Sequence, residues 1–139
     1  MATFVKYQCF VENLAEKIHN LGSDALKVAL TNAAPNVSTH TVLADITDLT
    51  TGGGYTAGGT APAITSSAQT AGTYKLVLGD VVFTATTGFG PFRYAVLYNS
   101  TAVGGPLIGY HDYGSSVTLL AGETFTWDAD PTNGVLTLA

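Results

Sequence analysis

The stretch GFGPFRYAVLYNSTAVGGPLIGYHDYG, residues 88–114, decides the fold of this chain. It holds six aromatic side chains, and two runs of β-prone residues flank a connection that contains Gly and Pro. Aromatic and β-branched residues favour strands, so we expect strands over 92–99 and 106–113. The stretch has no nucleophile motif, metal-ligand spacing or phosphate-binding loop. It therefore predicts a surface for packing, against this chain or against another protein.

The aromatic residues of this stretch have two interpretations. Side chains alternate along a strand, so Tyr94 and Tyr98 share one face and Arg93 lies on the other. The face is either half-buried in the chain or a protein interface, because Tyr, Phe and Arg are enriched at protein contacts. Aromatic faces also stack on sugar rings, which leaves carbohydrate binding open. The candidate interface residues are Phe92, Arg93, Tyr94, Tyr98, Tyr110 and Tyr113.

Composition narrows the class of protein. A length of 139 residues predicts a single domain over 1–139. Only 11% of residues are charged and 46% are hydrophobic, which indicates a compact protein that hides surface in an assembly. The formal net charge is −5, and the few Lys and Arg are scattered. We therefore expect no nucleic-acid partner, because phosphate binding needs clustered cations.

Cysteine usage and hydropathy give further expectations. Cys9 is the single cysteine, so no internal disulfide forms, and a packing thiol is favoured over a nucleophile. The first residues lack a basic region followed by a long apolar run, and no segment reaches the length of a membrane span. The sequence thus predicts no membrane partner and assembly in a cytoplasm.

Hydrophobic periodicity predicts one helix followed by strands. Residues 7–21 carry an apolar stripe at helical spacing, and Gly22 is a natural C-terminal cap. Residues 25–139 have the texture of a β-sandwich. We expect a flexible glycine-rich loop over 50–60 and a hairpin turn at Gly79-Asp80. The expected strands are 25–31, two within 74–86, then 92–99, 106–113, 117–120, 123–127 and 135–138, with a short strand or a turn over 42–49.

No chemical motif stands out. Asp128 and Asp130 before Gly134 resemble a calcium loop, but the spacing is off by one and the closing Glu is absent, so a turn is favoured. The histidines at 19, 40 and 111 lack metal or triad spacing. We expect no catalytic residues, no cofactor and no metal, although distant residues can still converge into a catalytic site.

Several blocks resemble a family of small virion proteins of tailed bacteriophages, the capsid cement or decoration proteins of jelly-roll type. The resemblance covers nearly the whole chain and is carried by FVENLAEKIHNLGSDALKVALTN (10–32), LADITDL (43–49), GGGYTAGGT (52–60), GPFRYAVLYN (90–99), PLIGYHDYG (106–114) and GETFTWDADPTNGVLTLA (122–139). It implies a capsid-binding role without enzyme activity or cofactor, and it gives no catalytic residues.

These inferences combine into one expectation and two rivals. We expect a mainly β, jelly-roll-like β-sandwich with one N-terminal α-helix. It would act as a structural protein on the exterior of a phage head, bound to the major capsid protein and to itself as a homo-oligomer, with a dimer favoured. One rival is a tail or fibre-associated adsorption protein that binds a host surface glycan. The other is a small hydrolase.

Overall fold

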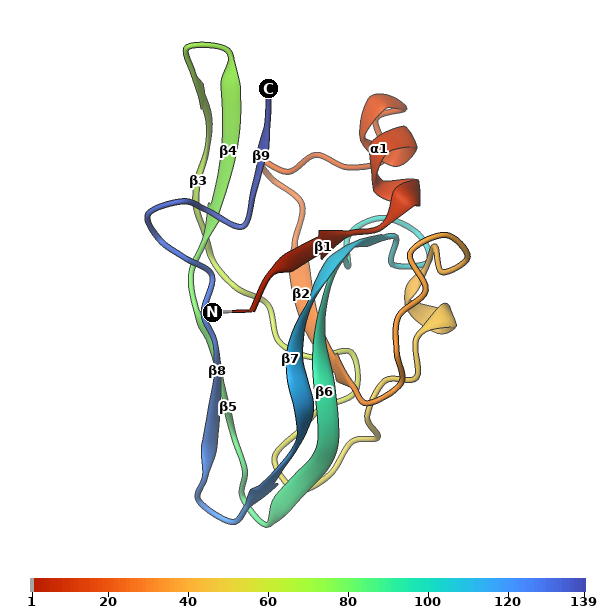
Figure 1. Cartoon of the computed structure of the whole chain (residues 1–139), viewed down its shortest axis with the longest axis vertical. Helices are drawn as coiled ribbons and strands as arrows, with labels where there is room; N and C mark the ends of the chain where they lie inside the picture. The colour runs from red at the N-terminus through yellow and green to blue at the C-terminus, as the bar shows by residue number, and fades with distance from the viewer. Residues whose placement is uncertain (1) are drawn as a thin grey trace.

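Antiparallel strands dominate the molecule, and one short helix lies near the N-terminus (Figure 1). The structure, a computed structural model, describes residues 2–139. Strands make up 47%, which confirms the mainly β fold with an N-terminal helix. The elements are β1 (Phe4–Lys6), α1 (Gln8–Ala15), β2 (Leu26–Thr31), the 3-10 turn η1 (Leu43–Asp45), β3 (Ile64–Thr70), β4 (Thr73–Leu78), β5 (Val81–Thr84), β6 (Gly88–Asn99), β7 (Leu107–Leu120), β8 (Thr124–Trp127) and β9 (Leu136–Leu138).

The largest sheet is built around the hairpin of β6 and β7, which contains the stretch that opened the sequence analysis. Its strand order is β1-β7-β6-β2, and every neighbouring pair is antiparallel. Ala29, Val96 and Tyr110 face one another across three strands and form one cross-strand row. The separate strand expected at 117–120 is the end of β7, which continues through a bulge after Asp112.

A second layer is formed by two smaller sheets, β3-β4-β9 and β5-β8. Figure 1 shows them one above the other on the side of the molecule away from α1, with β5 continuing the line of β4. The main apolar core joins residues of both layers, and its members include Phe10, Leu26, Leu30, Leu76, Leu78, Phe83, Phe92, Leu97, Ile108 and Trp127. The jelly-roll order of strands is not confirmed by this topology.

The outer face of the large sheet is also covered. Val96 and Leu107 project from it into a second cluster, which is closed by Tyr7 from the start of α1 and by Ile46 after η1. Each of these side chains is buried. The β6–β7 hairpin is therefore apolar on both faces, which explains its near-continuous run of apolar residues.

The helix is shorter than the expected 7–21, because it ends at Ala15. Lys17 has a φ of 68°, in the left-handed region, and the N–H of Ile18 reaches back to a helix carbonyl at 2.8 Å. This is a Schellman ending with Lys in the position that Gly usually takes. Gly22 is therefore not the helix cap.

The hairpin expected at Gly79-Asp80 is wrong. The two flanking strands form as expected, but β4 pairs with β3 and β9, whereas β5 pairs with β8. A type II′ turn needs a positive φ at its first central residue. Gly79 does not have one, and its N–H donates to the carbonyl of Ala63 at 2.8 Å. The pair is thus a transfer between two sheets.

The glycine-rich segment over 50–60 is tied down, contrary to the flexible loop that we expected. The Asp48 carboxylate accepts hydrogen bonds from the Tyr55 hydroxyl and, at 2.5 Å, from the N–H of Gly58. The Tyr98 hydroxyl donates to the Gly58 carbonyl at 2.6 Å. Gly59 has a φ of 76°, and a Cβ there would lie 1.7 Å from the Val28 carbonyl oxygen. The glycines allow close backbone approach to β2 rather than mobility.

The acidic segment near the C-terminus folds as a turn. Asp130 accepts hydrogen bonds at its side chain from the N–H groups of Thr132 and Asn133, at 3.1 and 3.0 Å. Its carbonyl accepts from the N–H of Gly134 at 2.8 Å. The bonds to its side chain lower the pKa of the Asp130 carboxyl, with the backbone bond from Asn133 as the largest cause. In the described part of the chain, no helix is long and apolar enough to cross a membrane.

Candidate interaction surface

The six candidate interface residues do not form one exposed face. Phe92, Tyr94 and Tyr98 are buried within the chain, whereas Arg93, Tyr110 and Tyr113 are partly exposed. An external protein can therefore reach only part of this set without rearrangement of the fold.

Each face of the large sheet carries a buried and a partly exposed aromatic member of this set. On the core side, the rings of Phe92 and Tyr113 both pack edge-to-face against Phe125, with centroids 4.9 and 5.0 Å away. On the outer side, Tyr94 packs edge-to-face against Tyr110 at 6.0 Å. Each such aromatic pair contributes about 0.5–1.5 kcal/mol to stability beyond the burial of its apolar area. These side chains therefore stabilise the fold of the chain itself.

An ion pair marks the exposed part of this region. The Arg93 guanidinium donates to both carboxylate oxygens of Asp112, at 2.8 and 3.0 Å, and lies 5.3 Å from the centre of the Tyr94 ring. The hydrogen bond from Arg93 is the largest cause that lowers the pKa of the Asp112 carboxyl. The half-exposed Tyr110 packs against the other side of this contact, on the Tyr94 ring. The result is a fixed charge pair beside an aromatic ring.

The chain holds its three histidines in separate hydrogen-bonding environments. His111 is 5% exposed and accepts a hydrogen bond at Nδ1 from the Trp127 indole N–H, at 3.0 Å. Burial lowers the pKa of His111 to about 4. The buried His19 hydrogen-bonds through Nδ1 to the side-chain amide of Asn99, at 3.1 Å. His40 accepts from the backbone N–H of Asn36 in a surface loop.

The one cysteine is a half-buried packing thiol. The Cys9 Sγ lies 3.8–3.9 Å from three backbone carbonyl oxygens, and the residue packs against the outer cluster of the large sheet. Burial is the main cause that raises the pKa of the thiol. Residues 2–139 contain no group of His, Cys, Asp or Glu side chains that could hold a metal ion.

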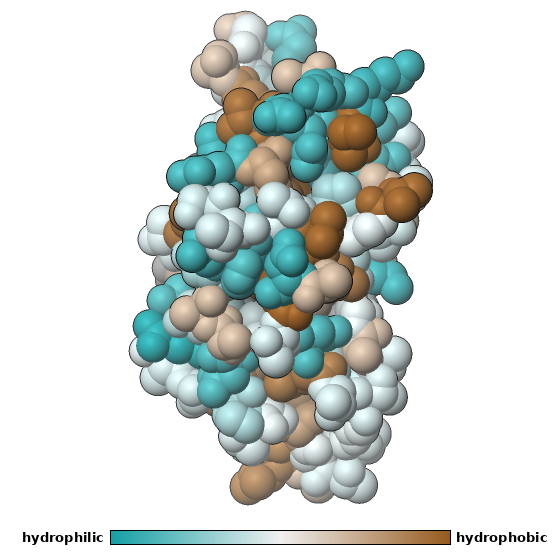
Figure 2. Space-filling view, turned by 90° about the vertical axis from the view of Figure 1, so that its right-hand side faces the viewer, coloured by the Kyte–Doolittle hydropathy of each residue, from teal (hydrophilic) through white to brown (hydrophobic). Residues whose placement is uncertain are grey.

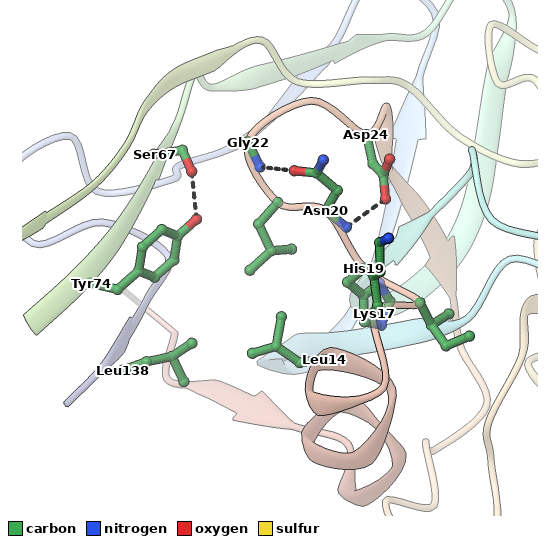
Figure 3. A pocket seen from close by; sticks show the side chains of 11 residues that line it. Leu14, Lys17, His19, Asn20, Gly22, Asp24, Ser67, Tyr74 and Leu138 are labelled. Carbon is green, nitrogen blue, oxygen red and sulfur yellow. Dashed lines mark hydrogen bonds between the residues drawn. The ribbon is translucent and has the colours of Figure 1, made fainter.

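One groove lies between the segment that follows α1 and the sheet β3-β4-β9, and it has a volume of about 500 Å³ (Figure 3). Most of its polar groups are already paired, but Nε2 of the buried His19 has no hydrogen-bond partner within residues 2–139. The Asn20 side chain accepts from the N–H of Gly22, Asp24 accepts from the N–H of Asn20, and the hydroxyls of Ser67 and Tyr74 lie 2.8 Å apart. The groove therefore presents few free groups for a reaction.

A second groove of about 440 Å³ lies where α1 approaches the turn between β6 and β7. It is bordered by two exposed apolar side chains, Ile18 (44% exposed) and Val103 (98% exposed). Val11 is a third large apolar side chain that α1 leaves in solvent. Figure 2 shows the face on which α1 lies, with several hydrophobic patches among hydrophilic atoms.

Sequence reasoning assigned Val11 and Ile18 to the apolar stripe of the helix, with core packing favoured and a subunit interface as the alternative, and it missed Val103 as a candidate contact. The helix ends at Ala15, so Ile18 leaves the helical register, whereas Val11 lies within α1 and is exposed on the helix itself. Val103 lies in the connection between two strands, where a lone apolar residue gives no periodic signal.

Comparison of the chain with protein-family models, with curated proteins and with solved structures gives no match.

Proposed function

We propose that this protein is a structural virion protein of a tailed phage, a capsid decoration protein that binds the outside of the head and stabilises the major capsid protein lattice. The proposal includes a jelly-roll-like sandwich, assembly in the host cytoplasm and no enzyme activity. Its first support is the resemblance of several sequence blocks to cement proteins. Its structural support is the set of exposed apolar side chains around the end of α1.

The exposed apolar side chains carry the proposal. Val103 is 98% exposed in a chain in which only 11% of residues are charged. Burying an aliphatic side chain of this size contributes about 1.5–3 kcal/mol, and exposed apolar patches mark contact sites. The surface of Ile18 and Val103 beside the second groove, here called the α1 surface, therefore fits a protein partner better than a polar substrate.

Two side chains that an enzyme could use, His111 and Cys9, already serve the packing of this fold, which favours a structural role. The Nδ1 of His111 accepts the indole N–H of Trp127, so this imidazole serves the core. The raised pKa of the Cys9 thiol keeps it protonated, and the thiolate is the nucleophilic form.

Lattice stabilisation then follows from mass action. A protein that binds the assembled shell and not the free subunit stabilises the shell by RT ln(1 + [L]/Kd). A weak contact suffices when many copies bind neighbouring subunits, since linked contacts raise the effective affinity. Binding to a single free capsid subunit should be slight, because only part of the composite site exists there.

Co-sedimentation with expanded heads tests the proposal. We expect Val103→Ser to weaken retention on heads at least tenfold, with hot-spot losses of about 2 kcal/mol. The matched control is Leu120→Ser, because Leu120 is also a large exposed side chain, at 68%, but lies at the far end of β7. Circular dichroism confirms folding of both variants. Equal retention of Val103→Ser and wild-type protein would reject the α1 surface, and tight binding to isolated capsid subunits would reject selection of the lattice.

A tail or fibre-associated adsorption protein is the alternative. The observation that favours it is the fixed pair of Arg93 and Asp112 beside the half-exposed Tyr110, since an aromatic ring with adjacent polar groups can hold a sugar. Copy number in purified virions separates the decoration protein from the tail or fibre-associated protein. Hundreds of copies per virion support decoration, whereas a few or tens support a tail component. In the second case Tyr110→Ala should reduce adsorption to host cells.

A further inference from the structure

Strand β3 forms a free edge. It pairs with β4 on one side and ends the order β3-β4-β9. The hairpin of β3 and β4 projects beyond the rest of the second layer (Figure 1). Within residues 2–139, no backbone hydrogen bond joins the outer side of β3 to another segment. Its outward N–H and C=O groups are thus open to another strand.

This edge lacks the usual protection. Natural edge strands carry charges, prolines or bulges that prevent pairing with another chain. The irregularity in β3 is confined to the step between Ile64 and Ser66. From Ser66 to Thr70 the register is regular, and the sequence SSAQT contains no charge and no proline.

The hairpin turn determines which groups point outward. Ala71 and Gly72 both have positive φ, 51° and 82°, so they form a two-residue turn of type I′. The flanking pair of Thr70 and Thr73 is then hydrogen-bonded, and the bonding alternates along the ladder. The N–H and C=O groups of Ser67 and Gln69 therefore face away from β4.

The distribution of charge favours a second copy of this chain as the occupant. The chain has a formal net charge of −5, so two copies repel at most approaches. The segment 49–79, however, contains no Asp or Glu and carries one cation, Lys75. The β3–β4 arm is therefore where two copies meet with little repulsion.

We propose that β3 pairs antiparallel with β3 of a second copy about a two-fold axis at Ala68. Ser67 of each copy then opposes Gln69 of the second copy, and the four outward N–H groups and four outward C=O groups are all paired. The sheet β3-β4-β9 of one copy and the same sheet of the second copy then join into one sheet of six strands. Because the arms overlap in opposite directions, the acidic bodies lie at opposite ends. This inference locates the expected dimer and is independent of capsid binding.

The pairing covers a small area, so the dimer is weak. Interfaces under about 1,200 Å² are typical of transient complexes. We expect a dissociation constant on the order of 10 µM. Sedimentation velocity from about 1 to 500 µM should therefore show a mass that rises from 14.3 kDa towards twice that value.

Substitutions on the edge test the pairing. Gln69→Pro removes an outward N–H and leaves the β3–β4 ladder intact. Gln69→Ala is its control, because it also removes the side-chain bond to Gly72 but keeps the backbone N–H. In the variant Ala68→Glu, the new carboxylate lies opposite Lys75 of β4 within one copy. In the dimer, however, the carboxylates of the two copies meet at the two-fold axis. We expect Gln69→Pro and Ala68→Glu to weaken dimerisation at least tenfold, and Gln69→Ala to weaken it less than threefold.

A cross-link tests the register. Ala68 forms a non-hydrogen-bonded pair with itself across the axis, and such Cα atoms lie about 4.5 Å apart, within reach of a disulfide. In a Cys9→Ser background, Ala68→Cys should oxidise to a covalent dimer and Gln69→Cys should not. Wild-type protein that is monomeric at every concentration would overturn the proposal. So would a dimer that survives both Gln69→Pro and Ala68→Glu. Neither result bears on retention by heads, which is measured separately.

Discussion

Acid should destabilise this protein through one buried imidazole. His111 is enclosed by the rings of Phe4, Tyr113 and Trp127, and Asp128 is the one nearby charge that acts on it. Burial outweighs that carboxylate and lowers the pKa of His111 from 6.5 to about 4. Between pH 6.5 and 4, His111 therefore binds a proton in the unfolded chain and stays neutral in the folded state. The stability from neutral His111 is complete above pH 6.5 and is lost as the pH falls towards 4.

The size of this loss follows from linkage. One pKa unit corresponds to about 1.36 kcal/mol, so the full shift contributes about 3 kcal/mol. Between pH 7 and 4.5 the titration of His111 should lower the free energy of unfolding by about 2.5 kcal/mol. This range lies above the ordinary pKa of Asp, so carboxylates whose pKa the fold lowers contribute little to it. The pKa of the buried His19 is also lowered, mainly by burial, and adds to the loss in the same direction.

Urea unfolding at each pH, followed by circular dichroism and by the fluorescence of Trp127, measures the effect. His111→Asn keeps an acceptor for the indole N–H but cannot titrate, so the loss on acidification should shrink by about 2.5 kcal/mol. Val81→Ala is the control, because Val81 pairs with Trp127 across β5 and β8 and is buried. It should cost about 2 kcal/mol at every pH. If His111→Asn and wild-type protein lost equal stability on acidification, the neutral buried imidazole would be refuted.

Three further predictions concern backbone conformation, each read as a free energy of unfolding in urea. Gly59→Ala should cost at least about 3 kcal/mol, because the added Cβ meets the backbone oxygen of Val28. Its control is Gly122→Ala, which has a φ of 84° but open space around it and should cost only about 1 kcal/mol. Equal costs for the two variants would disprove the close approach at Gly59. Lys17→Gly should stabilise by about 1 kcal/mol by relieving its left-handed φ, while Glu16→Gly, at φ −91°, should destabilise. Ala71→Asn should stabilise the type I′ turn by about 0.5–1 kcal/mol, and a destabilised variant would contradict that turn type.

The strands of the large sheet could be predicted because their pattern is local. Residues 92–99 are rich in aromatic and aliphatic side chains, and the expected strand forms with the predicted sharing of a face by Tyr94 and Tyr98. Their burial could not be predicted. It depends on Ile46, which is far away in sequence and lies in a segment without regular periodicity.

Other features lacked a local signal. Lys17 ends the helix in a conformation that its side chain does not favour, so only the tertiary structure explains it. Strand β3 is polar and reads as a loop, and it forms because Ala71-Gly72 turns it against β4. The glycine-rich segment was expected to be flexible, yet Asp48 just before it and Tyr98 far along the chain both bind Gly58.

The two proposed contacts differ in strength and reinforce each other. Pairing through β3 is weak in dilute solution, with a dissociation constant on the order of 10 µM. Copies held by the α1 surface on neighbouring lattice sites would have an effective concentration in the millimolar range, roughly a hundred times that constant. About 99% of suitably spaced arms would then be paired on the shell, although the free protein is largely monomeric at low concentration. An edge strand without charge is normally a liability in solution. If the proposed lattice binding holds, the same edge would tie neighbouring copies together, while the net charge of −5 limits premature association of free copies.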